Sequence, residues 1–114
     1  MIEKVIYDYL SGLLGFPVAV FTEDPLEPPA SYCLIEKTGG AMDDKIKEST
    51  IAVQSYASTL YDAMMLNETV KDVMLNGLIS LDTVSGVKLN SDYNYTDTAT
   101  KRYRYQAVFV INHY

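Results

Sequence analysis

The sequence predicts an α+β fold, in which a mainly antiparallel five-stranded sheet carries two helices on one face. Two segments repeat apolar residues at the spacing of a helix, and five others are short runs typical of strands. Because each helical segment has only one apolar stripe, each must bury that stripe against the sheet. The expected order along the chain is helix, strand, strand, strand, helix, strand, strand, all within one domain spanning residues 1–114.

The first helix is predicted at the N-terminus. Its apolar residues fall at i, i+3, i+4, i+7, i+8, i+11 and i+12, which is one helical face held for three turns; they are Ile2, Val5, Ile6, Tyr9, Leu10, Leu13 and Leu14. Gly12 weakens this helix, and Gly15 with Pro17 is expected to end it.

Three strands are predicted in the next forty residues. A short apolar run at 18–21 precedes a proline-rich connection, which we expect to be extended. Residues 31–37 and 49–55 form the next two strands, with Ile51 and Val53 on one side of the second. Between them, Gly39 and Gly40 predict a turn within a projecting loop at 38–45.

The second helix is predicted from about Ser58, a plausible N-cap, to Gly77. One face carries a stripe of apolar residues with a single polar member. This face is formed by Leu60, Ala63, Met64, Asn67, Val70, Val73 and Met74.

The last 28 residues predict an antiparallel hairpin that turns at residues 96–100. Centring the turn near Thr98 places Tyr93 opposite Tyr103 and Asp92 opposite Arg104. Strand alternation then directs the aromatic side chains toward the helices and the charged ones away. The aromatic set is Tyr93, Tyr103, Tyr105 and Phe109, and the charged set is Asp92, Arg102 and Arg104.

Composition and charge limit the classes of function. The formal net charge is −6, which argues against a protein that binds nucleic acid by neutralising phosphates. The longest apolar runs are far shorter than the roughly 20 residues that cross a bilayer, so no membrane contact is expected. Ten tyrosines favour strands and protein interfaces.

No motif predicts catalysis or a cofactor. Cys33 has no plausible base except His113 at the other end of the chain, so we expect it to be a buried small hydrophobe. Asp43 and Asp44 lack the ligand spacing of a metal loop, and a solvated loop or a partner contact explains them better. An enzyme is therefore not expected, and neither a cofactor nor a metal is assigned.

Four segments, taken together, resemble the small tail-terminator or tail-completion proteins of long-tailed siphophages and their prophages. They are residues 34–40, residues 52–57 leading into the second helix, residues 89–97 and residues 102–109. The resemblance covers nearly the whole chain from about residue 30, and the region before it agrees in having one helix and a proline-rich connection. None of the four segments is a catalytic signature.

The resemblance implies a structural protein with an α+β fold. Such proteins assemble as a ring, commonly hexameric, at the head-proximal end of the tail tube, stop its polymerisation and join the tail to the head. The implied partners are other copies of the chain, the tail-tube protein and a head-completion or connector protein. DNA would pass through the ring without specific binding, and the protein would be located in the virion after assembly in the bacterial cytoplasm.

The candidate assembly residues lie in the loop and on the polar face of the hairpin: Gly39, Gly40, Asp43, Asp44, Lys45, Asp92, Arg102 and Arg104. Charge reversal of Asp43 and Asp44 together is expected to impair ring formation or tail attachment. Two alternatives remain. One is another neck protein of the same virion, such as a head-closure protein, and the other is a small-molecule-binding or regulatory α+β domain.

Overall fold

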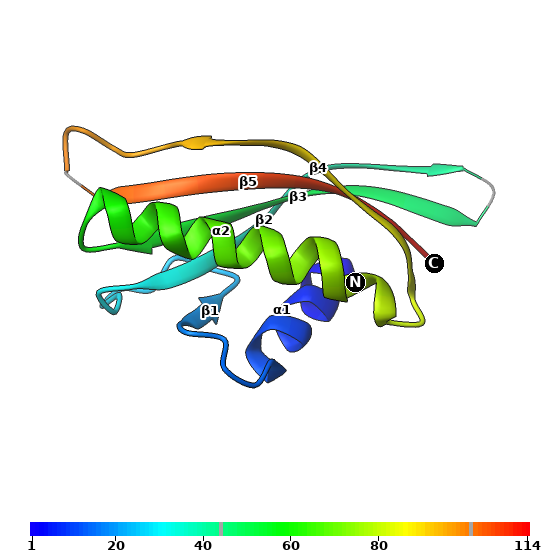
Figure 1. The fold of residues 1–114 in the computed structure, drawn as a ribbon. Helices are drawn as coiled ribbons and strands as arrows, with labels where there is room; N and C mark the ends of the chain where they lie inside the picture. Colours follow the sequence, from blue (N-terminus) through cyan, green and yellow to red (C-terminus); the bar gives the residue numbers. More distant parts are fainter. Residues whose placement is uncertain (44, 101) are drawn as a thin grey trace.

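The computed structural model describes residues 1–43, 45–100 and 102–114, and it has the α+β architecture and element order that the sequence predicts (Figure 1). The elements are α1 (Ile2–Gly12), β1 (Ala19–Phe21), β2 (Tyr32–Asp43), β3 (Ile46–Ala57), α2 (Leu60–Gly77), a short 3-10 helix η1 (Leu78–Ser80), β4 (Val84–Asn94) and β5 (Tyr103–His113). The five strands form one sheet in the order β1-β2-β3-β5-β4. Every pairing is antiparallel except the short parallel pair of β1 and β2.

Both helices pack on the same face of this sheet, where their apolar stripes join one hydrophobic core (Figure 1). Helix α1 contributes Ile2, Ile6 and Leu10, which are buried as the helical spacing predicts. Leu14, however, is fully exposed. The helix ends at Gly12, two residues before the stripe does, and the chain then turns through Gly15 at φ 85°.

Helix α2 is capped by Thr59, whose hydroxyl accepts a hydrogen bond from the Asp62 amide at 3.1 Å, so the predicted cap at Ser58 is wrong by one residue. The helix ends at Gly77, as predicted. Its buried stripe is Ala63, Leu66, Asn67, Val70 and Met74. Leu60 and Met64, predicted to be in the core, are instead more than a third exposed, because they lie at the flank of that stripe.

The glycine pair between the first two long strands does not form a turn. Gly39 and Gly40 lie inside β2 and pair with Thr50 and Ser49 of β3, after a bulge that follows Lys37. The two strands continue to Asp43 and Ile46, so the predicted loop is mostly a long hairpin that extends beyond the helices (Figure 1). The small size of glycine is compatible with a strand that is exposed on both faces.

The register predicted for the C-terminal hairpin is also wrong. Tyr93 pairs with Gln106 rather than Tyr103, and Asp92 pairs with Ala107 rather than Arg104. A bulge between Leu89 and Ser91 inserts one residue and therefore reverses the faces of the following side chains. Tyr93 consequently points away from the helices. Asp92 points toward them and bonds Lys71 of α2 at 3.1 Å, not Arg104.

Candidate assembly surface

The face of the sheet opposite the helices carries a connected network of tyrosine, arginine and glutamine side chains, which we call the helix-free face. No helix of the described residues packs on it, because both helices lie on the other side (Figure 1). Its members alternate along β2, β3 and β5 with core residues such as Ile35, Val53 and Phe109. They are Tyr32, Glu36, Gln54, Tyr56, Tyr93, Tyr95, Arg102, Arg104 and Gln106, together with Asp24 from the loop after β1.

Tyr56 is the centre of this network. Its ring stacks on that of Tyr32, with centroids 4.5 Å apart and planes 5° from parallel. The guanidinium carbons of Arg102 and Arg104 lie 4.7 and 5.5 Å from the centroid of the Tyr56 ring. Although no helix covers it, Tyr56 is only 4% exposed, because its neighbours on the face enclose it.

Arg102 joins the C-terminal hairpin to the loop after β1. Its two terminal nitrogens contact the two Asp24 carboxylate oxygens at 3.3 and 3.4 Å, and one also donates to the Tyr32 hydroxyl. Hydrogen bonding to Arg102 lowers the pKa of Asp24. Burial, followed by the hydrogen bond that the Tyr32 hydroxyl donates to Asp24, raises the pKa of Tyr32 to about 12. Tyr32 therefore stays neutral and remains a donor at physiological pH.

Arg104 is held by three groups. It donates to the Tyr56 hydroxyl at 2.6 Å and to the Tyr95 carbonyl oxygen at 2.7 Å, and its guanidinium lies 4.3 Å from the Tyr95 ring centroid. Tyr95 in turn packs edge to face with Tyr93, whose ring centroid is 5.7 Å away. The guanidinium group of Arg104 is thereby fixed beside Tyr93 and Tyr95, which are both more than 40% exposed.

A second chain of hydrogen bonds crosses the face from β2 to β4. Gln54 donates to Glu36 at 3.3 Å and to Gln106 at 3.0 Å, and Gln106 donates to the Tyr93 hydroxyl at 2.6 Å. Tyr56 links the two chains by donating to Gln54 at 2.9 Å. The polar groups of the face are thus held in fixed orientations by one another.

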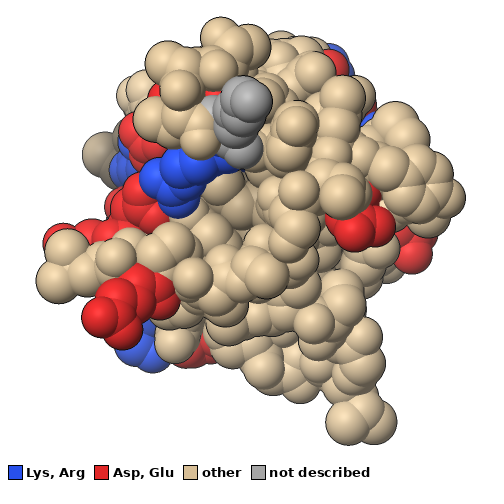
Figure 2. Space-filling view, turned by 90° about the vertical axis from the view of Figure 1, so that its left-hand side faces the viewer, with Lys and Arg blue, Asp and Glu red and all other residues tan. Residues whose placement is uncertain are grey.

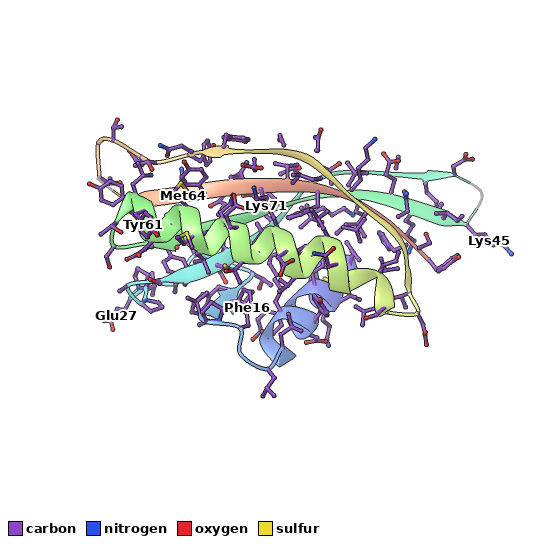
Figure 3. All side chains as sticks on the ribbon, in the orientation of Figure 1. Phe16, Glu27, Lys45, Tyr61, Met64 and Lys71 are labelled. Atoms are coloured by element: carbon purple, nitrogen blue, oxygen red, sulfur yellow. The ribbon has the colours of Figure 1, made fainter. Side chains whose placement is uncertain are left out.

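The predicted assembly residues do not form one cluster. Arg102 and Arg104 lie on the helix-free face, directed away from the helices as predicted. Asp92 lies on the helix side. Gly39, Gly40 and Asp43 are exposed on the β2–β3 hairpin, and Lys45 lies at its tip, far from the helices (Figure 3). Asp44 lies outside the described residues.

Sequence reasoning missed Tyr32, Tyr56 and Asp24. A usable signal existed for Tyr56, because alternation along β3 places it on the face opposite Ile51 and Val53, which were predicted to share one side. That assignment is confirmed, since Ile51 and Val53 are in the core. Asp24 had no such signal, because its position depends on the path of a proline-rich loop.

An apolar patch lies at one end of the molecule, at the start of α2. Figure 2 shows this end, where most of the surface is uncharged and more charged side chains lie on the left than on the right. Tyr61 is 64% exposed and Met65 is 48% exposed there, and Leu60 is beside them. Figure 3 shows Tyr61 and Met64 at this end of α2.

The other reactive side chains are structural. Cys33 is fully buried, and burial raises its pKa to about 12, so the thiolate that a nucleophile needs is absent at neutral pH. His113 is buried against Ser49, with Nε2 2.8 Å from the serine oxygen. Among the described residues, no three His, Cys, Asp or Glu side chains are placed to hold a metal ion.

Comparisons with known proteins assign no family. No protein-family model matches the chain, and a search of curated proteins gives no significant match. None of the helices in the described parts of the chain is both long and apolar enough to span a membrane.

Proposed function

We propose that this chain is a non-enzymatic structural protein of a siphophage virion. It caps the head-proximal end of the tail tube, ends tube polymerisation and joins the tail to the head. Its partners are other copies of itself in a ring, the tail-tube protein and a head-completion or connector protein. It would be located at the tail-head junction, with DNA passing through the ring without specific binding.

The observation that carries this proposal is the helix-free face. Arginine and tyrosine are the residues that most often dominate protein interfaces, because they combine apolar area with directional hydrogen bonds. Here Arg104 is fixed between Tyr56 and Tyr95 beside the exposed ring of Tyr93. Such a pre-oriented surface loses little side-chain entropy when a protein partner binds.

The same face is poorly suited to single-stranded nucleic acid. Bases stack on rings whose flat faces are open, but the Tyr56 ring is covered by Tyr32 and by the two guanidinium groups. One of these, Arg102, is paired with Asp24. The negative balance of the whole chain also opposes phosphate binding.

The proposal is tested by electron microscopy of the purified protein mixed with tail tubes of the same phage. We expect a ring of density at one end of each tube and a shorter, uniform tube length when the protein is present during polymerisation. Tubes that stay open and polydisperse at every ratio of the two proteins reject the role in tail termination. Another neck protein of the virion would instead bind the connector and leave tube length unchanged.

A further inference from the structure

Two long stretches of strand edge are not covered by another strand among the described residues. β1 pairs only with Tyr32–Leu34 of β2, so the outer side of β2 is free from Ile35 to Asp43. β4 is the last strand at the other end, and its outer side is free from Val84 to Asn94. Free edges of this length present unpaired backbone N–H and C=O groups.

The two free edges have the right polarity for each other. β2 runs antiparallel to β3, β3 to β5, and β5 to β4. After three reversals β4 runs antiparallel to β2. A second copy whose helices lie on the same side can therefore place its β4 beside β2 and extend the antiparallel ladder.

One alignment of β4 against β2 of the next copy matches both the faces to which the side chains point and the charges of those side chains. Placing Asp92 of one copy opposite Lys37 of the next pairs opposite charges on the helix side. The bulge after Lys37 in β2 then lies opposite the bulge after Leu89 in β4. Residues placed opposite each other therefore point to the same face of the sheet both before and after the bulges. Glu36 lies opposite Tyr93 on the helix-free side, and Gly40 lies opposite Leu89 on the helix side.

The same register staggers adjacent copies by two residues. Within one copy, Asp92 pairs with Ala107 of β5, Ala107 pairs with Val53 of β3, and Val53 pairs with Ile35 of β2. Asp92 and Ile35 therefore lie at the same height in the sheet. Across the contact between two copies, Asp92 lies opposite Lys37 of β2 instead, which is two residues further along the strand. A closed ring of strands requires a stagger of this kind, because a sheet closes into a barrel only with a shear between its ends.

The surface beside the free part of β2 has room for the incoming strand. A groove of about 500 Å³ lies between α1 and the outer side of β2, lined by Lys4, Tyr7 and Asp8 of α1, Thr22, and Ile35–Lys37 of β2. In the matched register the helix-side residues at the end of β4, Asp92 and Asn94, lie beside this groove, and Asp92 also bonds Lys71 of its own copy. Further along β2, residues 38–43 are exposed, and no strand among the described residues pairs with their outer side.

We propose that copies of this chain join head to tail through these two edges. The outer edge of β4 in one copy pairs antiparallel with residues 36–43 of β2 in the next, with Asp92 opposite Lys37. The contact is heterologous, which means that it joins two different surfaces of the chain. Repeating it closes a ring when a whole number of copies completes one full rotation. This inference deepens the proposed function by naming the strands that hold its ring together.

A disulfide tests the pairing directly. Ala41 of one copy is predicted to lie opposite Lys88 of the next, both on the helix-free side. Within one copy they are three strands apart, about 14 Å, which is too far for an internal disulfide. The variant Ala41→Cys with Lys88→Cys, oxidised with and without tail tubes, should give a ladder of covalent multimers on non-reducing gels. Mass spectrometry should map the link to positions 41 and 88.

The matched control is Met42→Cys with Lys88→Cys, which moves one thiol by a single residue to the opposite face of the sheet. The native Cys33 is buried and does not compete. The pairing is overturned if the 41–88 variant stays monomeric both with and without tail tubes. It is also overturned if the control variant gives an equally strong ladder of multimers. A ring on the tube ends without the 41–88 link rejects the edge contact and leaves the proposed function intact. Linked multimers that never cap a tube support the edge contact and reject the proposed function.

Discussion

Tyr56 connects the two hydrogen-bond chains of the helix-free face, so its hydroxyl group should contribute measurably to stability. The hydroxyl donates to Gln54 and accepts from Arg104. Tyr56→Phe removes both contacts and leaves a buried glutamine oxygen without its donor. We expect a loss of about 1–3 kcal/mol in the free energy of unfolding, measured by urea denaturation.

Tyr61→Phe is the control for this experiment. Tyr61 is 64% exposed on α2, and no hydrogen bond among the described residues involves its hydroxyl group. Removing that hydroxyl should change the free energy of unfolding by less than about 0.5 kcal/mol. Equal effects of the two substitutions would contradict the role of the network.

His113 should make the protein less stable in weak acid. Burial, with smaller contributions from Lys47 and Lys37, lowers the pKa of His113 below its ordinary value of 6.5. The unfolded chain therefore binds a proton more readily than the folded one. The stabilisation is fully present above pH 6.5 and is lost as the pH falls through the folded-state pKa.

Urea midpoints measured between pH 7.5 and pH 5 test this expectation in the wild type and in His113→Gln. The glutamine variant can keep a hydrogen bond to Ser49 but cannot take up the proton. Its stability should fall less steeply over this range. Parallel curves would show that other groups cause the pH dependence.

At the scale of elements, Gly77 at the end of α2 is closely fitted to Tyr9 of α1. A Cβ at position 77 would stand 2.0 Å from the Tyr9 hydroxyl, which donates to the Val73 carbonyl oxygen at 2.7 Å. Gly77→Ala must therefore displace this hydroxyl and break its hydrogen bond. We expect a loss of about 1–3 kcal/mol, despite the better helix propensity of alanine.

The cause can be separated with a second substitution. Tyr9→Phe removes the clashing oxygen, so Gly77→Ala should cost less in that background than in the wild type. The four variants form a double-mutant cycle measured by thermal or urea unfolding. Additive effects would indicate that the glycine is needed for some other reason.

The number, type and order of the elements could be predicted from the sequence, but the register of the C-terminal hairpin could not. Alternation identifies a strand and its faces only while the period of two is unbroken. The bulge between Leu89 and Ser91 breaks it, and no glycine or proline marks the position. Arg102 and Arg104 were placed correctly because β5 runs without a bulge, whereas Asp92 and Tyr93 lie beyond the bulge in β4.

Glycine misled the sequence interpretation in the β2–β3 hairpin for a related reason. A pair of glycines usually marks a turn, because glycine readily adopts a positive φ. Of the described glycines only Gly15 has a positive φ, and Gly39 and Gly40 remain extended. At Gly40 the absence of a side chain matters more than backbone freedom, since a Cβ there would stand 3.2 Å from Lys37 Cε.

At the scale of the whole molecule, the two faces of the sheet carry different kinds of side chain. The helix side holds the apolar core formed by α1, α2 and the strands. The helix-free side holds arginines whose removal should affect assembly more than folding. Arg102 is the clearest case, because its pair with Asp24 leaves both side chains about 40% exposed. Exposed ion pairs contribute about 0–1 kcal/mol.

Arg102→Ala should lower the free energy of unfolding by about 1–2 kcal/mol, because it removes the pair with Asp24, the hydrogen bond to the Tyr32 hydroxyl and the contact with the Tyr56 ring, and it should impair capping of tail tubes more strongly. The reason is that a fixed guanidinium at an interface can contribute far more to binding than the same group contributes to folding. Lys47→Ala is the matched control, since it removes one positive charge from β3, which takes no part in the proposed edge contact. The fraction of capped tubes, counted in electron micrographs at equal protein concentration, should fall for Arg102→Ala alone. A similar fall for both variants would mean that net charge, rather than the helix-free face, controls assembly.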